Sequence, residues 1–268
     1  MLVSDSFLDR PGARLAYAVS GPDQAERTLV SAHGLTSSRA NEDASGVFDW
    51  SAVASGGARL VRYDARGHGV STGRAEPDDY RWEHLAEDLL ALVDAVQPEQ
   101  PVDALGVSMG VGTLLWAALQ RPERFRRIVL VIPPTAWATR SGQAAVYESS
   151  ARFLEERGLA AFSKGLASMP PHPVLQAGGW WPLPDADVRE ELLPSIFRGA
   201  ARTDLPAAET LRDLAHEVLL LPWSDDPGHP VSTADRLAAV LPNATLEVAR
   251  TPEAISGWGS RISRFLSD

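Results

Sequence analysis

Seven short apolar runs recur along the chain, and several of them are nearly continuous in aliphatic residues. They are RLAYAVS, TLVSA, ARLVRYD, VDALGV, RIVLVI, EVLLLPW and TLEVA, at residues 14–20, 28–32, 58–64, 102–107, 127–132, 217–223 and 245–249. A strand that is buried on both faces lacks the polar alternation of a half-exposed strand. The runs therefore predict strands of a sheet that is covered on both sides.

Amphipathic helical patterns separate these runs. In residues 82–96 the apolar side chains fall at steps of three and four, which places them on one face of a helix. Residues 251–266 repeat this spacing, with Thr251 as the expected N-cap and Pro252 at the first helical position. Alternating strands and helices predict an α/β fold with a mostly parallel sheet flanked by helices.

The alternation breaks between about Thr135 and Leu214. This stretch has helical patterns and many prolines, and no good strand pattern lies inside it. An insertion at this point would overhang the carboxyl ends of the strands, where open α/β sheets bind their ligands. We therefore expect residues 136–213 to form a helical lid, and residues 1–135 and 214–268 to form the core.

The composition argues against several functions. Asp and Glu number 35 against 25 Lys and Arg, the net charge is −10, and no basic cluster marks a nucleic-acid surface. The chain has no cysteine, which excludes disulfides and cysteine nucleophiles. No signal-peptide pattern and no stretch of about 18 apolar residues is present. We expect a cytoplasmic protein with no nucleic-acid or membrane partner. No phosphate loop, nucleotide fingerprint or metal-ligand cluster appears, so no cofactor or metal is expected.

A serine stands at the centre of a G-x-S-x-G turn, Gly106 to Gly110. A strand-like run precedes Ser108 and a helix-like run follows it, which is the context that exposes a nucleophile at a sharp turn. The first amides of the helix can bind a developing oxyanion. Ser108 is a candidate nucleophile, and the alternative is an incidental serine in a glycine-bounded turn. A serine hydroxyl attacks only when a base accepts its proton.

Two further polar loops follow predicted strands. The loop SAHGLTSS, at 31–38, can supply a second oxyanion donor from the Leu35 amide, whereas His33 is expected to bond the loop backbone or to lie near substrate. The loop YDARGHGVS, at 63–71, contains an aspartate, an arginine and a histidine, which are expected to fix a turn rather than to do chemistry.

Three segments together resemble the α/β-hydrolase fold family in their order and spacing. They are AHGLTSS, RYDARGHGVST and LGVSMGVGTLLWAALQRPERFRRIVLV. The resemblance covers nearly the whole chain, and residues 136–213 stand in the place of the family's variable cap. It implies a mostly parallel eight-stranded sheet. In hydrolytic members it also implies a nucleophile, an acid after a later strand and a histidine near the C-terminus.

The resemblance assigns roles to residues of this chain. Ser108 matches the nucleophile, and the Met109 and Leu35 amides match the oxyanion hole. Asp226, after the run that ends at Trp223, matches the acid, with Asp225 as the alternative.

The histidine that the family carries near the C-terminus has no counterpart here. No histidine follows His229, and about two residues connect the last predicted strand to the last helix. His229, three residues after Asp226, is the first candidate base, and His172 in the lid's PPHP is the second. His33 lies close to the oxyanion loop but is expected to contribute its backbone. Two alternatives need no base: a non-hydrolytic enzyme, such as a lyase or isomerase, that polarises a carbonyl, and an inactive ligand-binding relative.

Aromatic residues in the lid suggest the kind of substrate. The motif GGWWPLP contains Trp180 and Trp181, which either line the mouth of a cleft or only pack the lid onto the core. Such a pocket should be apolar with few polar groups. We expect a small-molecule substrate: an apolar ester, lactone or thioester, cleaved by a serine hydrolase with an atypical or incomplete triad.

Overall fold

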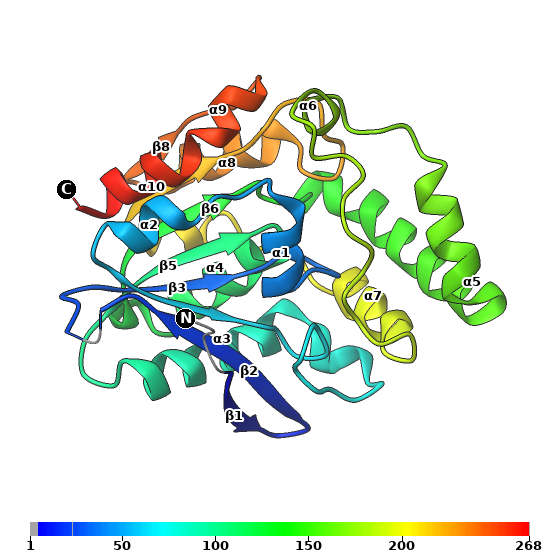
Figure 1. Cartoon of the computed structure of the whole chain (residues 1–268), viewed down its shortest axis with the longest axis horizontal. Helices are drawn as coiled ribbons and strands as arrows, with labels where there is room; N and C mark the ends of the chain where they lie inside the picture. Colours follow the sequence, from blue (N-terminus) through cyan, green and yellow to red (C-terminus); the bar gives the residue numbers. More distant parts are fainter. Residues whose placement is uncertain (1–4, 23, 268) are drawn as a thin grey trace.

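The strands form one sheet of eight in the computed structural model, which describes residues 5–22 and 24–267. They are β1 (Ser6–Arg10), β2 (Ala13–Ser20), β3 (Thr28–Ala32), β4 (Arg59–Tyr63), β5 (Val102–Val107), β6 (Phe125–Val131), β7 (Glu217–Leu221) and β8 (Ala244–Leu246). Their order is β1-β2-β4-β3-β5-β6-β7-β8 (Figure 1). The β1–β2 and β2–β4 pairs are antiparallel and every later pair is parallel. The predicted α/β fold with a mostly parallel eight-stranded sheet is confirmed.

Helices connect the strands and cover the sheet. They are α1 (Arg39–Ser45), α2 (Ser51–Ser55), α3 (Trp82–Val96), α4 (Met109–Gln120), α5 (Arg140–Ala167), α6 (Pro173–Ala177), α7 (Leu193–Ala201), α8 (Val231–Val240), α9 (Pro252–Ser256) and α10 (Trp258–Ser267). Short 3-10 helices span Pro77–Tyr80, Pro122–Arg124, Trp137–Thr139 and Thr210–Asp213.

The two faces of the central strands are buried in different apolar clusters. Along β6, Ile128 and Leu130 belong to one cluster and Val129 and Val131 to the other, because successive side chains of a strand point to opposite faces. Side chains of α3, α4 and α8 complete the first cluster, and side chains of α2 and α10 complete the second. This double covering explains why the strand runs lack polar alternation.

Two elements differ from the sequence prediction. The predicted strands do not include β1, because this edge strand has only two apolar residues and none of its side chains is fully buried. The predicted helix 251–266 is interrupted at Gly257, which separates α9 from α10. A glycine inside a helix is destabilising. Thr251 caps α9 as predicted, since its hydroxyl oxygen accepts a bond from the Ala254 amide at 3.4 Å.

The stretch between β6 and β7 holds α5, α6 and α7 and contributes no strand to the sheet. The helix α5 bends at Gly158, whose φ is 75° and ψ is 170°. In Figure 1, α5 and α7 lie beyond the end of the sheet to which the arrow of β5 points. We refer to residues 136–213 as the lid segment, and its role as a separate cap stays a prediction.

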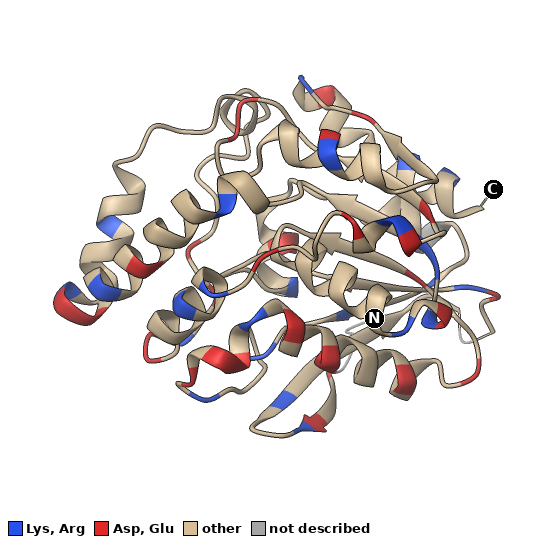
Figure 2. Cartoon of the chain, turned by 180° about the vertical axis from the view of Figure 1, so that it is seen from behind, with Lys and Arg blue, Asp and Glu red and all other residues tan. Residues whose placement is uncertain are grey.

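Charged residues are spread over the outer helices and loops. On the face seen in Figure 2, Lys and Arg are interspersed with Asp and Glu. In the part of the chain that the structure describes, none of the helices has the length and apolar character that crossing a bilayer requires.

The helix α4 approaches the sheet very closely at its first turn. A Cβ on Gly110 would lie 2.1 Å from the carbonyl oxygen of Ala32 in β3. A Cβ on Gly106 would lie 2.3 Å from the carbonyl oxygen of Gly110. Both glycines are therefore required by the close approach of backbone to backbone.

We predict that Gly110→Ala lowers the free energy of unfolding by about 3 kcal/mol or more, because the added methyl group overlaps the backbone. Urea unfolding followed by circular dichroism measures the effect. Gly165→Ala is the matched control, since a Cβ there meets nothing within 4 Å and alanine favours a helix by up to about 1 kcal/mol. Equal stability of the two variants would contradict the packing argument.

Candidate active site

Ser108 lies between β5 and α4 in a strained backbone conformation. Its φ is 51° and its ψ is −107°, a combination that non-glycine residues rarely adopt. The Ser108 amide donates to the Val131 carbonyl of the neighbouring strand at 3.1 Å, which holds the turn. The Ser108 side chain therefore projects beyond the end of β5. Met109 is the first residue of α4, so its amide has no hydrogen-bond acceptor within the helix.

The loop of residues 33–38, which we call the oxyanion loop after its predicted role, runs beside Ser108. A Cβ on Gly34 would lie 3.6 Å from the Ser108 Cβ. Across the described residues, the Leu35 amide donates to no protein acceptor. The structure therefore places Gly34, the residue before Leu35, beside the serine that precedes Met109. The oxyanion roles of the Leu35 and Met109 amides stay predictions.

His33 supports this loop from the core side. Its Nε2 accepts the Ala65 amide hydrogen at 2.9 Å, so its Nδ1 carries the proton and donates to the Gly34 carbonyl at 2.8 Å. Burial lowers the pKa of His33 and favours the neutral ring. Both ring nitrogens are engaged with backbone, which leaves none of them for a substrate.

A tight turn brings Asp226 and His229 together on the loop between β7 and α8. The His229 amide donates to the Asp226 carbonyl at 3.2 Å and to its Oδ1 at 3.3 Å. The same Oδ1 accepts the Gly228 amide hydrogen at 2.8 Å. Aspartate commonly closes turns in this way. The Gly228 carbonyl also accepts the Thr135 amide hydrogen at 3.1 Å, which ties the turn to the end of β6.

The side chains of Ser108, His229 and Asp226 form a hydrogen-bonded chain. His229 Nε2 lies 2.7 Å from Ser108 Oγ, and His229 Nδ1 lies 2.7 Å from Asp226 Oδ2. Because a charged carboxylate only accepts, Nδ1 carries the proton and Nε2 presents its lone pair to the serine hydroxyl. The three residues therefore have the geometry of a nucleophile, a base and an orienting acid.

Asp226 is held in its charged form. Burial alone would raise the pKa of its carboxyl, but the hydrogen bonds and charge of His229 and the bond from Trp223 outweigh burial and hold this pKa well below its usual range. Trp223 Nε1 donates to Oδ2 at 2.7 Å. This bond from Trp223 was not among the sequence predictions. The position of Trp223 at the end of a predicted strand, three residues before Asp226, could have indicated it.

The other candidate base and acid occupy different positions. His172 Nε2 is 4.0 Å from Asp226 Oδ2, and its ring packs against Trp223 with 5.5 Å between centroids. Within the described part of the chain, neither ring nitrogen of His172 has a hydrogen-bond partner. Asp225 is exposed and accepts from the Ser224 hydroxyl at 2.7 Å. His172 therefore faces the carboxylate, and Asp225 is bonded to a serine rather than to a histidine.

Five residues, 247–251, connect β8 to α9, and the part of this connection that is not paired with the neighbouring segment of the chain is as short as the sequence predicts. Backbone pairing continues past β8 to Ala249, whose amide donates to the Pro222 carbonyl at 2.8 Å. Only Arg250 and Thr251 then precede α9. The lid segment, rather than a longer loop before α9, packs beside the Asp226–His229 turn: side chains of α6 belong to the apolar cluster that contains Trp223.

Trp180 and Trp181 are half-buried and pack against the same cluster. Their packing onto the core is thus clear, and their contact with substrate stays a prediction. Among the residues that the structure describes, no three His, Asp or Glu side chains are grouped as metal ligands.

Comparison with known proteins gives the family. A family model described as alpha/beta hydrolase fold matches residues 27–251. The chain belongs to the alpha/beta hydrolase fold family. The match includes Ser108, Asp226 and His229 and the whole lid segment.

Relatives within this alpha/beta hydrolase family include lactonases. The 3-oxoadipate enol-lactonase 2 of Acinetobacter baylyi is 27% identical over 203 residues, which cover 70% of this chain and 69% of that protein. The crystal structure of a hydrolase from Pseudomonas aeruginosa superposes with a TM-score of 0.81 at 23% identity over 100% of both chains. The enol-lactonase from Burkholderia xenovorans has a TM-score of 0.79 at 19% identity, covering 98% of this chain and 100% of that one. At these identities the structures show the common fold.

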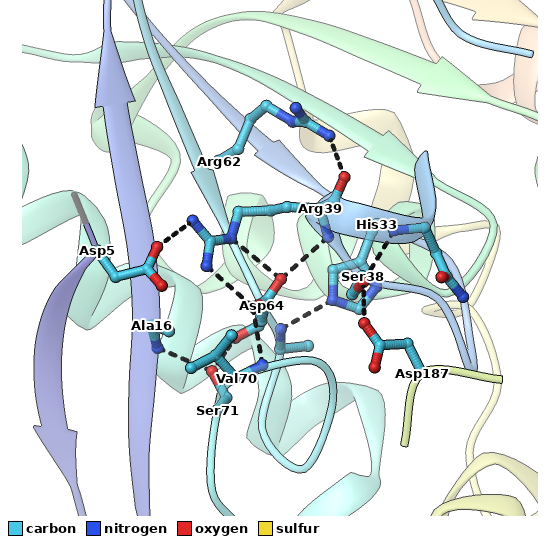
Figure 3. Close-up of polar contacts among 12 residues, drawn as sticks. Asp5, Ala16, His33, Ser38, Arg39, Arg62, Asp64, Val70, Ser71 and Asp187 are labelled. Carbon is cyan, nitrogen blue, oxygen red and sulfur yellow. Dashed lines mark hydrogen bonds and ion pairs between the residues drawn. The ribbon is translucent and has the colours of Figure 1, made fainter. Parts of the chain in front are cut away.

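An ion pair at the end of β4 anchors the start of α1, next to the oxyanion loop (Figure 3). Asp64 accepts from the Arg39 amide at 3.0 Å and from its guanidinium at 3.0 and 3.1 Å. It also accepts from the Val70 amide at 3.1 Å. Burial would raise the pKa of Asp64, but these bonds outweigh it and lower the pKa. The arrangement agrees with the expectation that this loop fixes a turn.

We predict that Asp64→Asn lowers the free energy of unfolding by about 2 kcal/mol at pH 7, because it removes the buried carboxylate charge that Arg39 contacts and leaves the guanidinium only the ion pair with Asp5. Since the folded pKa is below the unfolded one, the wild-type advantage is present above the ordinary aspartate pKa of about 3.9 and is lost as pH falls. Urea unfolding at pH 7 and pH 3 measures both. Asp9→Asn, at a 92% exposed side chain, is the control, and a pH-independent difference would contradict the prediction.

Proposed function

We propose that this chain is a serine hydrolase that cleaves a small apolar ester, lactone or thioester through Ser108. The observation that carries the proposal is the hydrogen-bonded chain from Ser108 Oγ through His229 to Asp226, with 2.7 Å at each bond. A base within this distance of a serine in a strained turn is the requirement for nucleophilic attack. The hydrolases among the relatives support the same reaction class.

In the first half of the proposed reaction, Ser108 Oγ attacks the substrate carbonyl carbon while His229 Nε2 takes the hydroxyl proton. The carbonyl oxygen becomes an oxyanion, which the Met109 and Leu35 amides stabilise. Collapse of this intermediate breaks the bond to the leaving oxygen or sulfur, which receives the proton from His229. The acyl group is then esterified to Ser108.

In the second half, water replaces the leaving group. His229 Nε2 takes a proton from water as the hydroxide oxygen attacks the acyl carbon. The second oxyanion collapses, Ser108 Oγ leaves with the proton from His229, and a carboxylic acid is released. Asp226 keeps the Nδ1 proton of His229 in place and stabilises the imidazolium that forms in both halves.

Apolar groups surround the side where substrate would enter. Leu35 packs against a lid cluster that includes Leu193 and Phe197. These contacts favour a neutral, apolar acyl or alcohol group over an anionic one.

A hydrogen bond from Ser108 to a base favours hydrolysis over the two alternatives. A serine that only donates to a carbonyl, as in a non-hydrolytic enzyme, does not need an imidazole oriented by a carboxylate. A ligand-binding relative needs neither. Both alternatives remain outcomes of the labelling experiment below.

We predict that a fluorophosphonate probe labels Ser108 in the wild type and fails to label Ser108→Ala. His229→Ala is expected to lower the labelling rate and kcat by about 10⁴-fold or more, because the serine loses its base. His172→Ala is expected to keep both within about tenfold, since its ring faces Asp226 rather than the serine. Mass spectrometry identifies the labelled peptide, and esterase kinetics give kcat.

Other outcomes would change the assignment. Loss of labelling in His172→Ala but not in His229→Ala would make the lid histidine the base. A wild type that takes up no label, while an ester analogue still raises its melting temperature, would rule out hydrolysis and favour binding or another reaction.

We predict that p-nitrophenyl butyrate is hydrolysed with a kcat/KM at least about tenfold above that of the p-nitrophenyl monoester of succinate, because an unpaired buried carboxylate is unfavourable. The two substrates share the leaving group and nearly the same acyl length, so the terminal charge is the difference that is tested. Steady-state kinetics at several salt concentrations measure it. Faster hydrolysis of the succinate ester would contradict the apolar assignment.

A further inference from the structure

The lid segment holds the oxyanion loop through Asp187, a residue outside the triad. The Asp187 amide, between α6 and α7, donates to the Thr36 carbonyl at 2.9 Å. The Ser38 hydroxyl donates to Asp187 Oδ2 at 2.5 Å. Figure 3 shows the Asp187 carboxylate and Ser38 turned toward each other from different parts of the chain. One lid residue thus bonds the loop at two points, Thr36 and Ser38.

The oxyanion loop needs such support. A turn closes it, with the Ser37 amide donating to the Gly34 carbonyl at 3.2 Å. Inside this turn Thr36 has a φ of 61°, a left-handed conformation that is unfavourable for a β-branched residue. A conformation of this kind persists only where the surroundings hold it. Leu35, with its free amide, is the residue next to this strained position.

The supports on the two sides of the loop have different origins. His33 and Ala65, both of the core, hold the start of the loop through the Gly34 carbonyl. Asp187, of the lid segment, holds its end. A charge-assisted O–H···O⁻ bond is shorter and stronger than a neutral one, and 2.5 Å is at the short end of that range. The Leu35 amide lies between the two supports.

The Asp187 backbone is fixed in turn. Its carbonyl accepts the Gly69 amide hydrogen at 2.8 Å, and the next residue, Val188, forms a β-bridge with His68. The lid segment at this point is therefore bonded to two loops of the core. Asp187 can transmit that rigidity to the oxyanion loop.

We infer that Asp187 is a positioning residue that orients the Leu35 amide toward the oxyanion by holding Thr36 and Ser38. The inference rests on the proposed serine-hydrolase function and adds to it a lid residue that acts on the transition state. Since the oxyanion forms only after attack, a loosened donor lowers kcat more than it changes substrate binding.

The test compares Asp187→Ala and Asp187→Asn with wild type on p-nitrophenyl butyrate. The alanine variant is expected to lose about 10- to 100-fold in kcat with KM changed by less than about threefold, as for a weakened oxyanion donor. The asparagine variant keeps an acceptor for Ser38 and is expected to recover part of the loss. If the alanine variant folds poorly, the asparagine variant carries the test.

Two further variants separate positioning from general lid attachment. Asn41→Ala removes a neighbouring lid contact, the 2.7 Å bond from Asn41 Nδ2 to the Asp185 carbonyl, and is expected to keep kcat within about twofold because it leaves the bond between Ser38 and Asp187 in place. The double variant Ser38→Ala/Asp187→Ala is expected to lose no more kcat than the larger single loss, since both substitutions remove that same bond and only Ser38→Ala also removes the bond from the Asn41 amide.

Inhibition by a compound that forms a tetrahedral adduct with Ser108 distinguishes a positioning role of Asp187 from a role in stability alone. Butylboronic acid forms a bond from boron to Ser108 Oγ and places a charged oxygen at the oxyanion position, whereas the neutral butyramide binds without that bond or charge. Asp187→Ala is expected to weaken boronate inhibition by the same factor as kcat and to leave butyramide inhibition within about twofold.

These experiments test the positioning role of Asp187 separately from the proposed serine-hydrolase function. An active wild type whose Asp187 variants keep kcat and boronate affinity would overturn the inference alone, even if their melting temperature fell. A wild type that neither labels nor hydrolyses would overturn the proposed function, and the inference with it.

Discussion

The hydrogen bond between Asp226 and His229 is the interaction on which the candidate site depends. The two residues are three positions apart, and the turn between them is closed by the same carboxylate, whose Oδ1 accepts backbone amides while Oδ2 faces the imidazole. One aspartate therefore shapes the loop and orients the ring toward Ser108. In the proposed mechanism the acid and the base therefore lie on one short turn, and no separate C-terminal histidine loop is needed.

The parallel strands explain why one short turn is enough to bring His229 to Ser108. The turn at Ser108 follows β5, the oxyanion loop follows β3 and the Asp226–His229 turn follows β7. All three therefore lie at the carboxyl ends of parallel strands, at the same edge of the sheet. The bond from Thr135 to Gly228 ties the third to the end of β6. The lid segment then bonds the oxyanion loop through Asp187. The sheet edge, rather than any one motif, brings these groups together.

Much of the fold and part of the site follow from the sequence. Apolar runs identify seven of the eight strands, because burial on both faces removes polar alternation from the central ones. The edge strand β1 has no such run, and none of its side chains is fully buried. Gly106 and Gly110 mark the turn at Ser108 because a side chain on either would overlap backbone, that of α4 for Gly106 and that of β3 for Gly110. The short connection before Thr251 indicates that the usual base loop is absent, and local spacing makes His229 the first substitute.

Sequence spacing placed His229 before His172 and His33 as the candidate base, but it could not show which ring reaches Ser108, because spacing gives no ring orientation. Tertiary structure makes the difference: His33 is bonded to backbone on both sides, His172 faces the carboxylate, and His229 reaches Ser108. Asp187 carries no sequence signal at all, since its partners are about 150 residues away along the chain. Local patterns depend on neighbours in the chain, whereas the direction of a side chain and the contacts of a lid depend on residues that only folding brings near.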